Sequence, residues 1–260
     1  MGTVWWADLG MFRRWQLGVL DDTERGRLAA IRHPGRRRQS TLGAVLLRLA
    51  VADRCGVPAD RLRVVRSCPS CPEPHGRPRL PGHRLSVAVS HSGRRVVVAV
   101  SDQGEIGVDV ERRDPDRAAA ELALWCRREA VVKATGDGLR VRVRDVRISP
   151  PPGPLRLLGY PGRPDLRARL WDLRPGPGYL GAAALVVPTA PTGRERLVER
   201  SAATLLSRRP RPDGLRRRAA GRQLHAATAA QPSCRDRSGR PRRRMVLRSV
   251  AARSRRETDG

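Results

Sequence analysis

The chain has 260 residues, a formal net charge of +28 and 39% hydrophobic residues, which is enough for one large domain or two small ones. No apolar run approaches the ~18 to 20 residues that cross a bilayer, so the sequence excludes a membrane-spanning protein and we expect no membrane partner. Of the 53 basic residues only Lys133 is a lysine, and this arginine bias, with 25 glycines and 22 prolines, is typical of GC-rich codon usage.

The positive charge therefore says little about function by itself. Arginine-rich proteins bind nucleic acid because they neutralise phosphates, and an arginine-rich nucleic-acid-binding protein is one alternative. Codon bias explains the charge without a nucleic-acid partner, so we regard that partner as unlikely. The charge is still expected to steer anionic ligands and acidic partner proteins towards the surface.

Five cysteines, an odd number with no signal peptide ahead of them, favour a reducing environment, so we predict a cytoplasmic protein. Cys68 and Cys71 with His75 have half the spacing of a structural zinc site. No second cysteine pair lies nearby, and a fourth ligand would have to come from His83 or further away. We favour a loop without metal and keep structural zinc as the alternative.

Residues 1–84 are predicted to form an N-terminal subdomain. The stretch TVWWADLG has the density of a buried strand, and DDTERGRLAAI resembles a capped helix with acids in its first turn. We expect Trp5, Trp6 and Trp15 to pack in the interior. A second helix is expected towards residue 55, because apolar residues recur there at three and four, and a short strand is expected over residues 61–67.

Three consecutive arginines, Arg36 to Arg38, precede this second helix together with Ser40. Free amide groups at a helix start, the helix dipole and guanidinium groups all favour an anion. The run, with Arg38, is therefore a candidate phosphate site. A solvated basic edge is an equally good interpretation.

Residues 85–188 are predicted to form a C-terminal subdomain. Three strands joined by tight turns, an antiparallel meander, are expected over residues 84–111, followed by a helix at about 117–134 that Gly136 and Gly138 close. Three further strands are expected at residues 141–150, 166–173 and 178–187. This order predicts an α+β fold of two similar halves.

Residues 189–260 have a different character. From residue 191 onwards there are 20 arginines, six acids and no aromatic residue. Such a composition cannot bury enough apolar surface to fold alone, so we predict a disordered, arginine-rich tail. A basic RNA- or membrane-binding arm is one alternative, and an out-of-frame segment of GC-rich DNA is another.

The stretch GVDVE carries two carboxylates with strand spacing. Asp109 and Glu111 face the same way on a strand because side chains alternate, whereas Val108 and Val110 face the core. Like charges so close together repel, and one carboxyl must take up a proton unless a cation joins the pair. This stretch is therefore a candidate cation site.

The stretch WCRREAVVK places Trp125, Glu129 and Lys133 on one face of the predicted helix, four residues apart. An exposed Glu129–Lys133 pair worth ~0.3 to 0.5 kcal/mol is the simple alternative. Three carboxylates, however, suit a hard cation, and magnesium commonly binds a few carboxylates together with phosphate oxygens. We predict a magnesium site at Asp109, Glu111 and Glu129. A lone lysine also indicates a need for a compact, mobile charge.

His91 lies in the SHSG turn beside the acidic strand. Its imidazole and the Ser90 hydroxyl are able to donate to phosphate oxygens, although a lone turn histidine is usually structural or exposed. The neighbouring acidic strand favours the functional interpretation.

Taken in order, VSHSG, IGVDVE and W-x-x-[KR]-E-A-x-x-K ending in G-x-G-L resemble the 4′-phosphopantetheinyl transferases. LGAVLLR and HGRPRL resemble the N-terminal half of that family. The resemblance covers roughly residues 4–187, and this length fits the surfactin-type group with two subdomains. Arg128 and Arg77 stand where the family motifs K-E-A and G-K-P have lysine, so both keep the charge.

The resemblance implies a pseudo-dimer of two α+β halves with coenzyme A in the cleft between them. It also implies that Asp109, Glu111 and Glu129 bind magnesium and that Lys133 contacts the phosphate near the scissile bond. Ser90 and His91 would contact coenzyme A phosphates, and Arg77 keeps a charge that can grip a phosphate.

The implied activity is transfer of the 4′-phosphopantetheine arm of coenzyme A to a serine of an apo acyl, peptidyl or aryl carrier protein, with release of adenosine 3′,5′-bisphosphate. Glu129 is the candidate base and Lys133 stabilises the leaving phosphate. We expect a monomer, because two internal halves complete the cleft. A magnesium-dependent phosphohydrolase using the same carboxylates is the enzymatic alternative.

Overall fold

The computed structural model describes residues 1–68, 73–150, 154–188 and 192–208, and these residues form a mixed α+β fold. Within this part of the chain four α-helices occur, at Asp22–Ala29 (α1), Pro34–Cys55 (α2), Ala119–Thr135 (α3) and Ala203–Ser207 (α4). The strands are Gly2–Asp8 (β1), Ser86–Ser92 (β2), Arg95–Ser101 (β3), Glu105–Arg112 (β4), Arg147–Ile148 (β5), Leu157–Gly159 (β6), Arg167–Leu173 (β7), Tyr179–Val187 (β8) and Leu197–Ser201 (β9). None of the described helices is long and apolar enough to cross a membrane.

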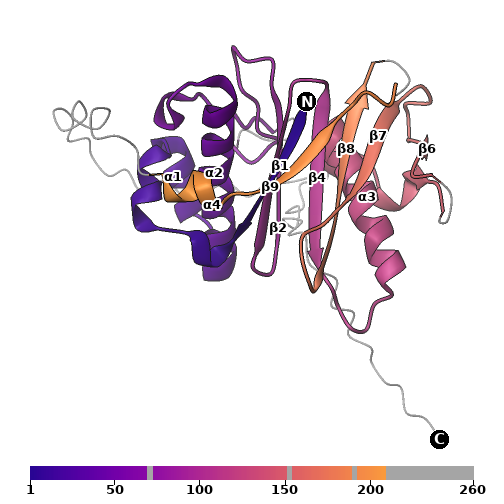
Figure 1. Cartoon of the computed structure of the whole chain (residues 1–260), viewed down its shortest axis with the longest axis horizontal. Helices are drawn as coiled ribbons and strands as arrows, with labels where there is room; N and C mark the ends of the chain where they lie inside the picture. Colours follow the sequence, from indigo (N-terminus) through magenta and orange to yellow (C-terminus); the bar gives the residue numbers. More distant parts are fainter. Residues whose placement is uncertain (69–72, 151–153, 189–191, 209–260) are drawn as a thin grey trace, which may run out of the picture. The chain divides into compact units, whose positions relative to one another are not determined.

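The elements stack in layers (Figure 1). Helices α1, α2 and α4 cover one face of a sheet with the order β2-β3-β1-β9. The other face of this sheet packs on a second sheet, β4-β8-β7, through a cluster that includes Val97, Ala99, Val108 and Val110. Helix α3 covers the outer face of the second sheet. The predictions that Val108 and Val110 face the core are thus confirmed.

Local sequence signals are found at the ends of the helices. The Asp21 side chain accepts a hydrogen bond from the Glu24 amide and caps α1. Helix α2 has Pro34 in its first turn and ends at Gly56, and α3 ends at Gly136, both glycines being left-handed at φ 70° and 73°. Helix α2 therefore begins at Pro34, before the arginine run that was expected to precede it.

Trp5 and Trp6 of β1 are buried on opposite faces of the first sheet. The prediction that they pack in the interior is thus confirmed. Trp5 belongs to the core beneath the helices, whereas Trp6 belongs to the core between the two sheets. Trp15 is only half-buried. Strand alternation thus lets two adjacent tryptophans serve two different cores.

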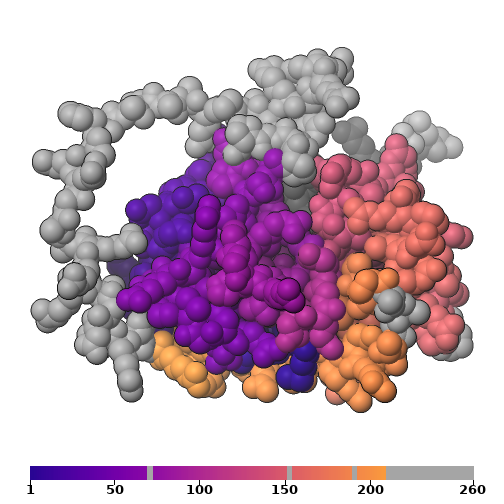
Figure 2. Space-filling model, turned by 90° about the horizontal axis from the view of Figure 1, so that it is seen from above, coloured from indigo at the N-terminus to yellow at the C-terminus, as the bar shows by residue number. Residues whose placement is uncertain are grey.

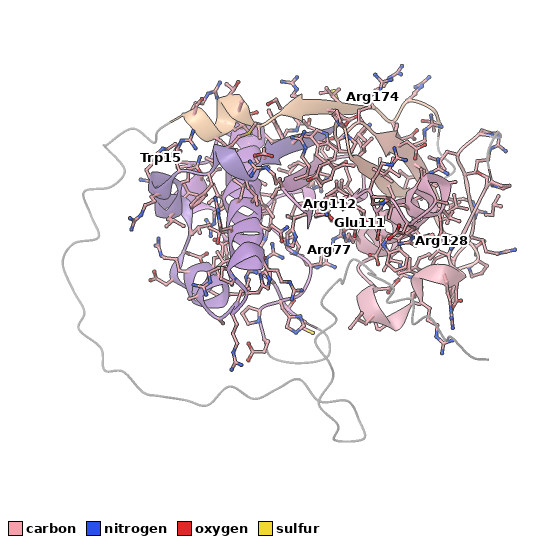
Figure 3. All side chains as sticks on the ribbon, turned by 90° about the horizontal axis from the view of Figure 1, so that it is seen from below. Trp15, Arg77, Glu111, Arg112, Arg128 and Arg174 are labelled. Atoms are coloured by element: carbon pink, nitrogen blue, oxygen red, sulfur yellow. The ribbon has the colours of Figure 1, made fainter. Side chains whose placement is uncertain are left out.

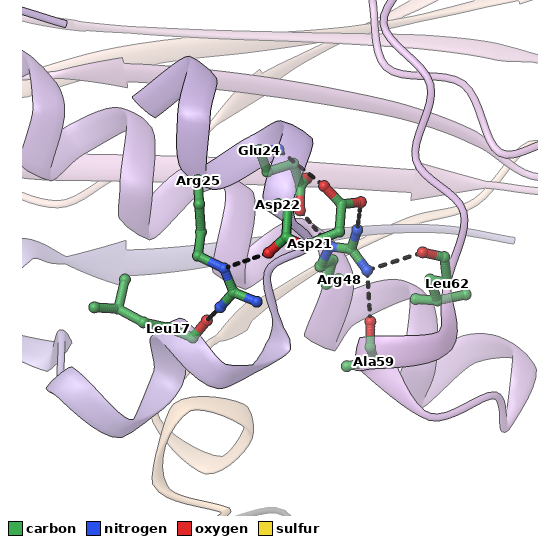
Figure 4. A network of polar contacts seen from close by, with 8 residues as sticks. All are labelled: Leu17, Asp21, Asp22, Glu24, Arg25, Arg48, Ala59 and Leu62. Atoms are coloured by element: carbon green, nitrogen blue, oxygen red, sulfur yellow. Dashed lines mark hydrogen bonds and ion pairs between the residues drawn. The ribbon is translucent and has the colours of Figure 1, made fainter. Parts of the chain in front are cut away.

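A buried ion cluster joins α1, α2 and the segment after α2 to one another (Figure 4). Arg48 of α2 is fully buried, and its guanidinium contacts the carboxylates of Asp21 and Glu24. Its Nη1 donates to the carbonyl oxygens of Ala59 and Leu62, each at 2.9 Å. The cluster ties α1 and the segment after α2 to α2 itself, and removing one partner of such a buried pair typically costs about 3 to 5 kcal/mol.

Three expectations about strands were wrong. Residues 61–67 contribute one isolated bridge, Val65 to Arg79, and only Arg147–Ile148 is a strand within residues 141–150. The meander over residues 84–111 is incomplete, because β2 pairs with β3 but β4 pairs with β8 instead of β3. The division between the two sheets therefore falls between β3 and β4, some way beyond the boundary proposed at residue 84.

The predicted disorder of the tail is wrong for its first part. Within residues 189–260 the structure contains β9, which pairs in parallel with β1, and α4. Glu199 of β9 accepts hydrogen bonds from Trp6 Nε1 at 2.7 Å and from the Arg174 amide at 2.9 Å. Leu205 and Leu206 of α4 are buried in the core beneath the helices. Polar β9 folds because tertiary contacts, not its own composition, hold it.

The β9–α4 segment, Leu197–Ser207, is therefore expected to be required for stability. Figure 2 shows the last described residues, in orange, along one side of the molecule. A chain ending at residue 190 loses the burial of Ala202, Leu205 and Leu206, which is worth several kcal/mol at roughly 1.5 to 3 kcal/mol per leucine.

Thermal unfolding followed by circular dichroism tests this expectation. The chain ending at residue 190 should unfold at least about 5 °C below the full chain. The matched control is a chain that ends at Arg208. It should unfold at the same temperature as the full chain, because the composition of residues 209–260 predicts no contribution to the stability of the fold. Equal stability of the two truncated chains would contradict the role given to β9 and α4.

Candidate active site

The candidate site lies where two edge strands meet. Strand β2 is the edge of the first sheet and β4 is the edge of the second. Their backbones do not pair with each other, yet serine hydroxyls of β2 bond to groups of β4 at both ends of the strands. Glu111, one of the site residues, is labelled in the central region of the molecule in Figure 3.

Helix α3 approaches β4 unusually closely at this place. A Cβ atom at Gly107 would lie 2.0 Å from the Ala130 carbonyl oxygen and 2.4 Å from the Ala134 amide nitrogen. Only glycine therefore permits the contact between strand and helix. This close approach brings the side chains of Glu129 and Lys133 on α3 to the acidic face of β4.

Lys133 and Asp109 form the centre of the site. The Lys133 Nζ donates to Asp109 Oδ1 at 2.5 Å and to Ser90 Oγ at 2.9 Å, and Ser90 Oγ donates to Asp109 Oδ1 at 2.9 Å. Asp109 is 1% exposed. Burial lowers the pKa of Lys133, but Asp109 and Glu129 outweigh burial and leave the pKa raised, so the lysine is charged.

Glu111 is the second carboxylate of β4 and has a different environment. Its Oε2 accepts a hydrogen bond from Ser92 Oγ at 2.8 Å. Burial and the neighbouring charge of Asp109 raise the pKa of Glu111 to about 7. A carboxylate pair on one strand face therefore does have the electrostatic conflict that the spacing predicts.

Glu129 completes the set from the helix. It is 5% exposed, which excludes the exposed i,i+4 pair that was the alternative for Glu129 and Lys133. The pKa of Glu129 is raised, and burial is the largest cause. The positive charge of Lys133 lowers this pKa and the negative charge of Asp109 raises it, so the three charged groups are electrostatically coupled. A carboxyl with a raised pKa suits a general base that works near neutral pH.

The charges of these groups do not balance within the protein. Asp109, Glu111 and Glu129 face a single lysine, and Asp109 Oδ2 is buried with no hydrogen-bond partner among the described residues. An unsatisfied buried carboxylate oxygen and an excess of buried carboxylates are what a hard cation would relieve. In the described chain no three His, Cys, Asp or Glu side chains are already grouped around one point, so a cation would have to draw these carboxylates together.

His91 lies within β2 itself and not in the turn after it. Burial, followed by the charge of Lys133, lowers the pKa of His91 to about 4, and Arg36 contributes in the same direction. His91 is therefore neutral at physiological pH and lies near two cations. Arg36, from the arginine run that is the candidate phosphate site, is therefore a neighbour of His91.

The predicted arginines divide into different roles. Arg38 is exposed within α2, on the surface. Arg77 donates through Nη1 to the Ala134 carbonyl at 2.6 Å and through Nη2 to Ser86 Oγ at 2.7 Å and the Ile106 carbonyl at 3.0 Å. These bonds make Arg77 a clamp between α3, β2 and β4. Arg128 donates from Nε to the Val146 carbonyl at 2.9 Å (Figure 3).

A groove of about 530 Å³ lies at the Arg77 end of the contact between β2 and β4. It is lined by residues 77–87 and by the loop between β3 and β4, including Ser86 and Glu105. Ser86 faces the start of β4, whereas Ser92 faces its end. The groove and the carboxylates thus occupy opposite ends of the same contact between strands.

The zinc alternative falls partly outside the described residues, because Cys71 is not among them. Cys68 and His75 each have an interaction with another group. The alternative therefore stays a prediction.

No protein-family model and no curated protein sequence matches this chain. The resemblance to the phosphopantetheinyl transferases accordingly depends on the motif residues alone.

The raised pKa of Glu111 predicts a pH-dependent stability without divalent cations. Its folded pKa of about 7 exceeds the ordinary pKa of a glutamate, 4.5, so the folded chain holds this proton more tightly. The contribution to the free energy of unfolding is complete below about pH 4.5 and is lost as the pH rises through about 7, by up to about 3 kcal/mol. Glu111→Gln should remove the loss.

Urea unfolding in a chelating buffer checks this. At about pH 5 the wild type and Glu111→Gln should be similarly stable, and at about pH 8 the variant should be the more stable. A stability difference that stays constant between the two pH values would contradict the raised pKa.

Proposed function

We propose that the protein transfers the 4′-phosphopantetheine arm of coenzyme A to a serine of an apo carrier protein and releases adenosine 3′,5′-bisphosphate. The observation that carries the proposal is the set of buried Asp109 and Glu129 and half-buried Glu111 with Lys133 among them, beside the Ser90–His91 pair of β2. Two sheets packed face to face, each with a long helix on its outer face, also suit the two-half architecture that the resemblance implies.

Asp109, Glu111 and Glu129 would hold the magnesium ion, and Asp109 Oδ2 is a buried oxygen in need of a partner. Bound there, magnesium would neutralise charge on the pyrophosphate oxygens of coenzyme A. Among the described residues Lys133 Nζ donates to two acceptors, which leaves its third N–H for a phosphate oxygen. Neutral His91 supplies one further N–H donor nearby.

In the transfer, the carrier serine oxygen forms a bond to the phosphorus that carries the pantetheine arm. The pyrophosphate P–O bond breaks, and its electron pair leaves with adenosine 3′,5′-bisphosphate. Glu129 takes the serine proton, directly or through water, and Lys133 stabilises the leaving phosphate. Positioning and charge stabilisation therefore supply most of the catalysis.

A transfer assay tests the proposal. The full chain, coenzyme A and magnesium are incubated with several apo carrier proteins, and mass spectrometry should detect one added phosphopantetheine arm on a carrier. Failure with every carrier, by a preparation that binds coenzyme A, would overturn the proposal. Hydrolysis of coenzyme A without a carrier would instead identify a phosphohydrolase.

Glu129→Gln tests the role of the base. The substitution keeps the size of the side chain and should lower the transfer rate by about 10² to 10⁴, the usual range for general base catalysis. Glu121→Gln on the same helix is the matched control, because Glu121 is exposed and forms a surface ion pair with Arg117. Transfer by Glu129→Gln at the control rate would remove Glu129 from this role.

A further inference from the structure

The contact between β2 and β4 is made by small residues. Positions 86, 88, 90 and 92 of β2, which are Ser, Ala, Ser and Ser, share one face because strand side chains alternate. We call the three hydroxyls of Ser86, Ser90 and Ser92, with their partners on β4, the serine seam. The seam joins strands whose backbones do not pair with each other.

Two of the serines take up backbone groups on the free edge of β4. Ser86 Oγ accepts from the Ile106 amide at 2.8 Å and Ser92 Oγ accepts from the Arg112 amide at 3.0 Å. Each hydroxyl also donates to a carboxylate of β4, Ser86 to Glu105 at 3.1 Å and Ser92 to Glu111 at 2.8 Å. Each of these serine hydroxyls accepts from a backbone amide of β4 and donates to a glutamate side chain of β4. It therefore holds that side chain in a fixed position relative to the β4 backbone.

The two positions differ in what they orient. Glu105 is half exposed and pairs with Arg77, so Ser86 serves the clamp at the start of β4. Glu111 is a candidate magnesium ligand, and Ser92 is the hydroxyl that the structure gives it. Partners that orient the ligands of a metal commonly change its affinity by 10- to 100-fold when they are removed.

We propose that Ser92 is a positioning residue of the candidate site: anchored on the Arg112 amide, it holds Glu111 beside Asp109 so that the pair can bind a divalent cation. This inference rests on the proposed function, which supplies the metal. Its test measures metal binding and does not require transfer activity. The reacting atoms are not touched by Ser92.

The test is a titration of the full chain with Mn²⁺ alone. Electron paramagnetic resonance measures the concentration of free Mn²⁺ during the titration. Ser92→Ala should weaken Mn²⁺ binding about tenfold or more, and Ser92→Thr, which keeps the hydroxyl, should restore most of the affinity. Ser86→Ala is the matched control from the same seam and should stay within about twofold of wild type. Thermal unfolding of each variant verifies that it is folded.

Equal weakening by Ser86→Ala and Ser92→Ala would overturn the inference, because the seam would then act only through packing. Unchanged affinity in Ser92→Ala, or no Mn²⁺ binding by the wild type, would overturn it as well. In transfer assays, the magnesium concentration for half-maximal rate should rise about tenfold in Ser92→Ala with the maximal rate recovered. If no carrier accepts the arm but Mn²⁺ binding responds as expected, the proposed function fails and the positioning role stands.

Discussion

The gathering of three carboxylates, two of them buried, around one lysine is the constraint on which the site depends. Asp109 and Glu129 are almost completely buried, and Lys133 satisfies only one oxygen of Asp109. Burying like charges together is unfavourable unless protons, donors or a cation offset the repulsion. The pKa of about 7 for Glu111 records this conflict in the protein alone. A site for a cation and an anionic substrate is the simplest chemical reason to retain such an arrangement.

The rest of the fold holds these groups in place. Gly107 lets α3 lie directly on β4, Arg77 ties the end of α3 to both edge strands, and the serines of β2 bridge to β4. The two sheets are fixed face to face by a common core and by Glu199 of β9, which bonds to Trp6 and to the backbone after β7. Strands and a helix therefore carry the three carboxylates and Lys133, which favours a preorganised site.

Local patterns predicted which candidate side chains share a face better than they predicted the sheets. Strand alternation placed Asp109 and Glu111 on one face, and helical spacing placed Glu129 and Lys133 together, because both periods are local properties. Strand pairing is not local, so the pairing of β4 with β8 and of polar β9 with β1 left no signal in the neighbouring sequence. Ser92 was missed for the same reason: its partner Glu111 is distant in the chain, although the small residues at alternate positions of β2 were visible.

The central claim is that the carboxylates of β4 and α3 bind a cation together with the phosphates of coenzyme A. The most direct test is calorimetric titration of the full chain with coenzyme A, performed once in a buffer that contains magnesium and once in a buffer that contains a chelator. We expect clear binding of coenzyme A with magnesium and a loss of about tenfold or more in affinity when the metal is removed, since two ligands that share one site are reciprocally coupled. Binding of equal strength in chelator, or no binding with magnesium, would contradict it.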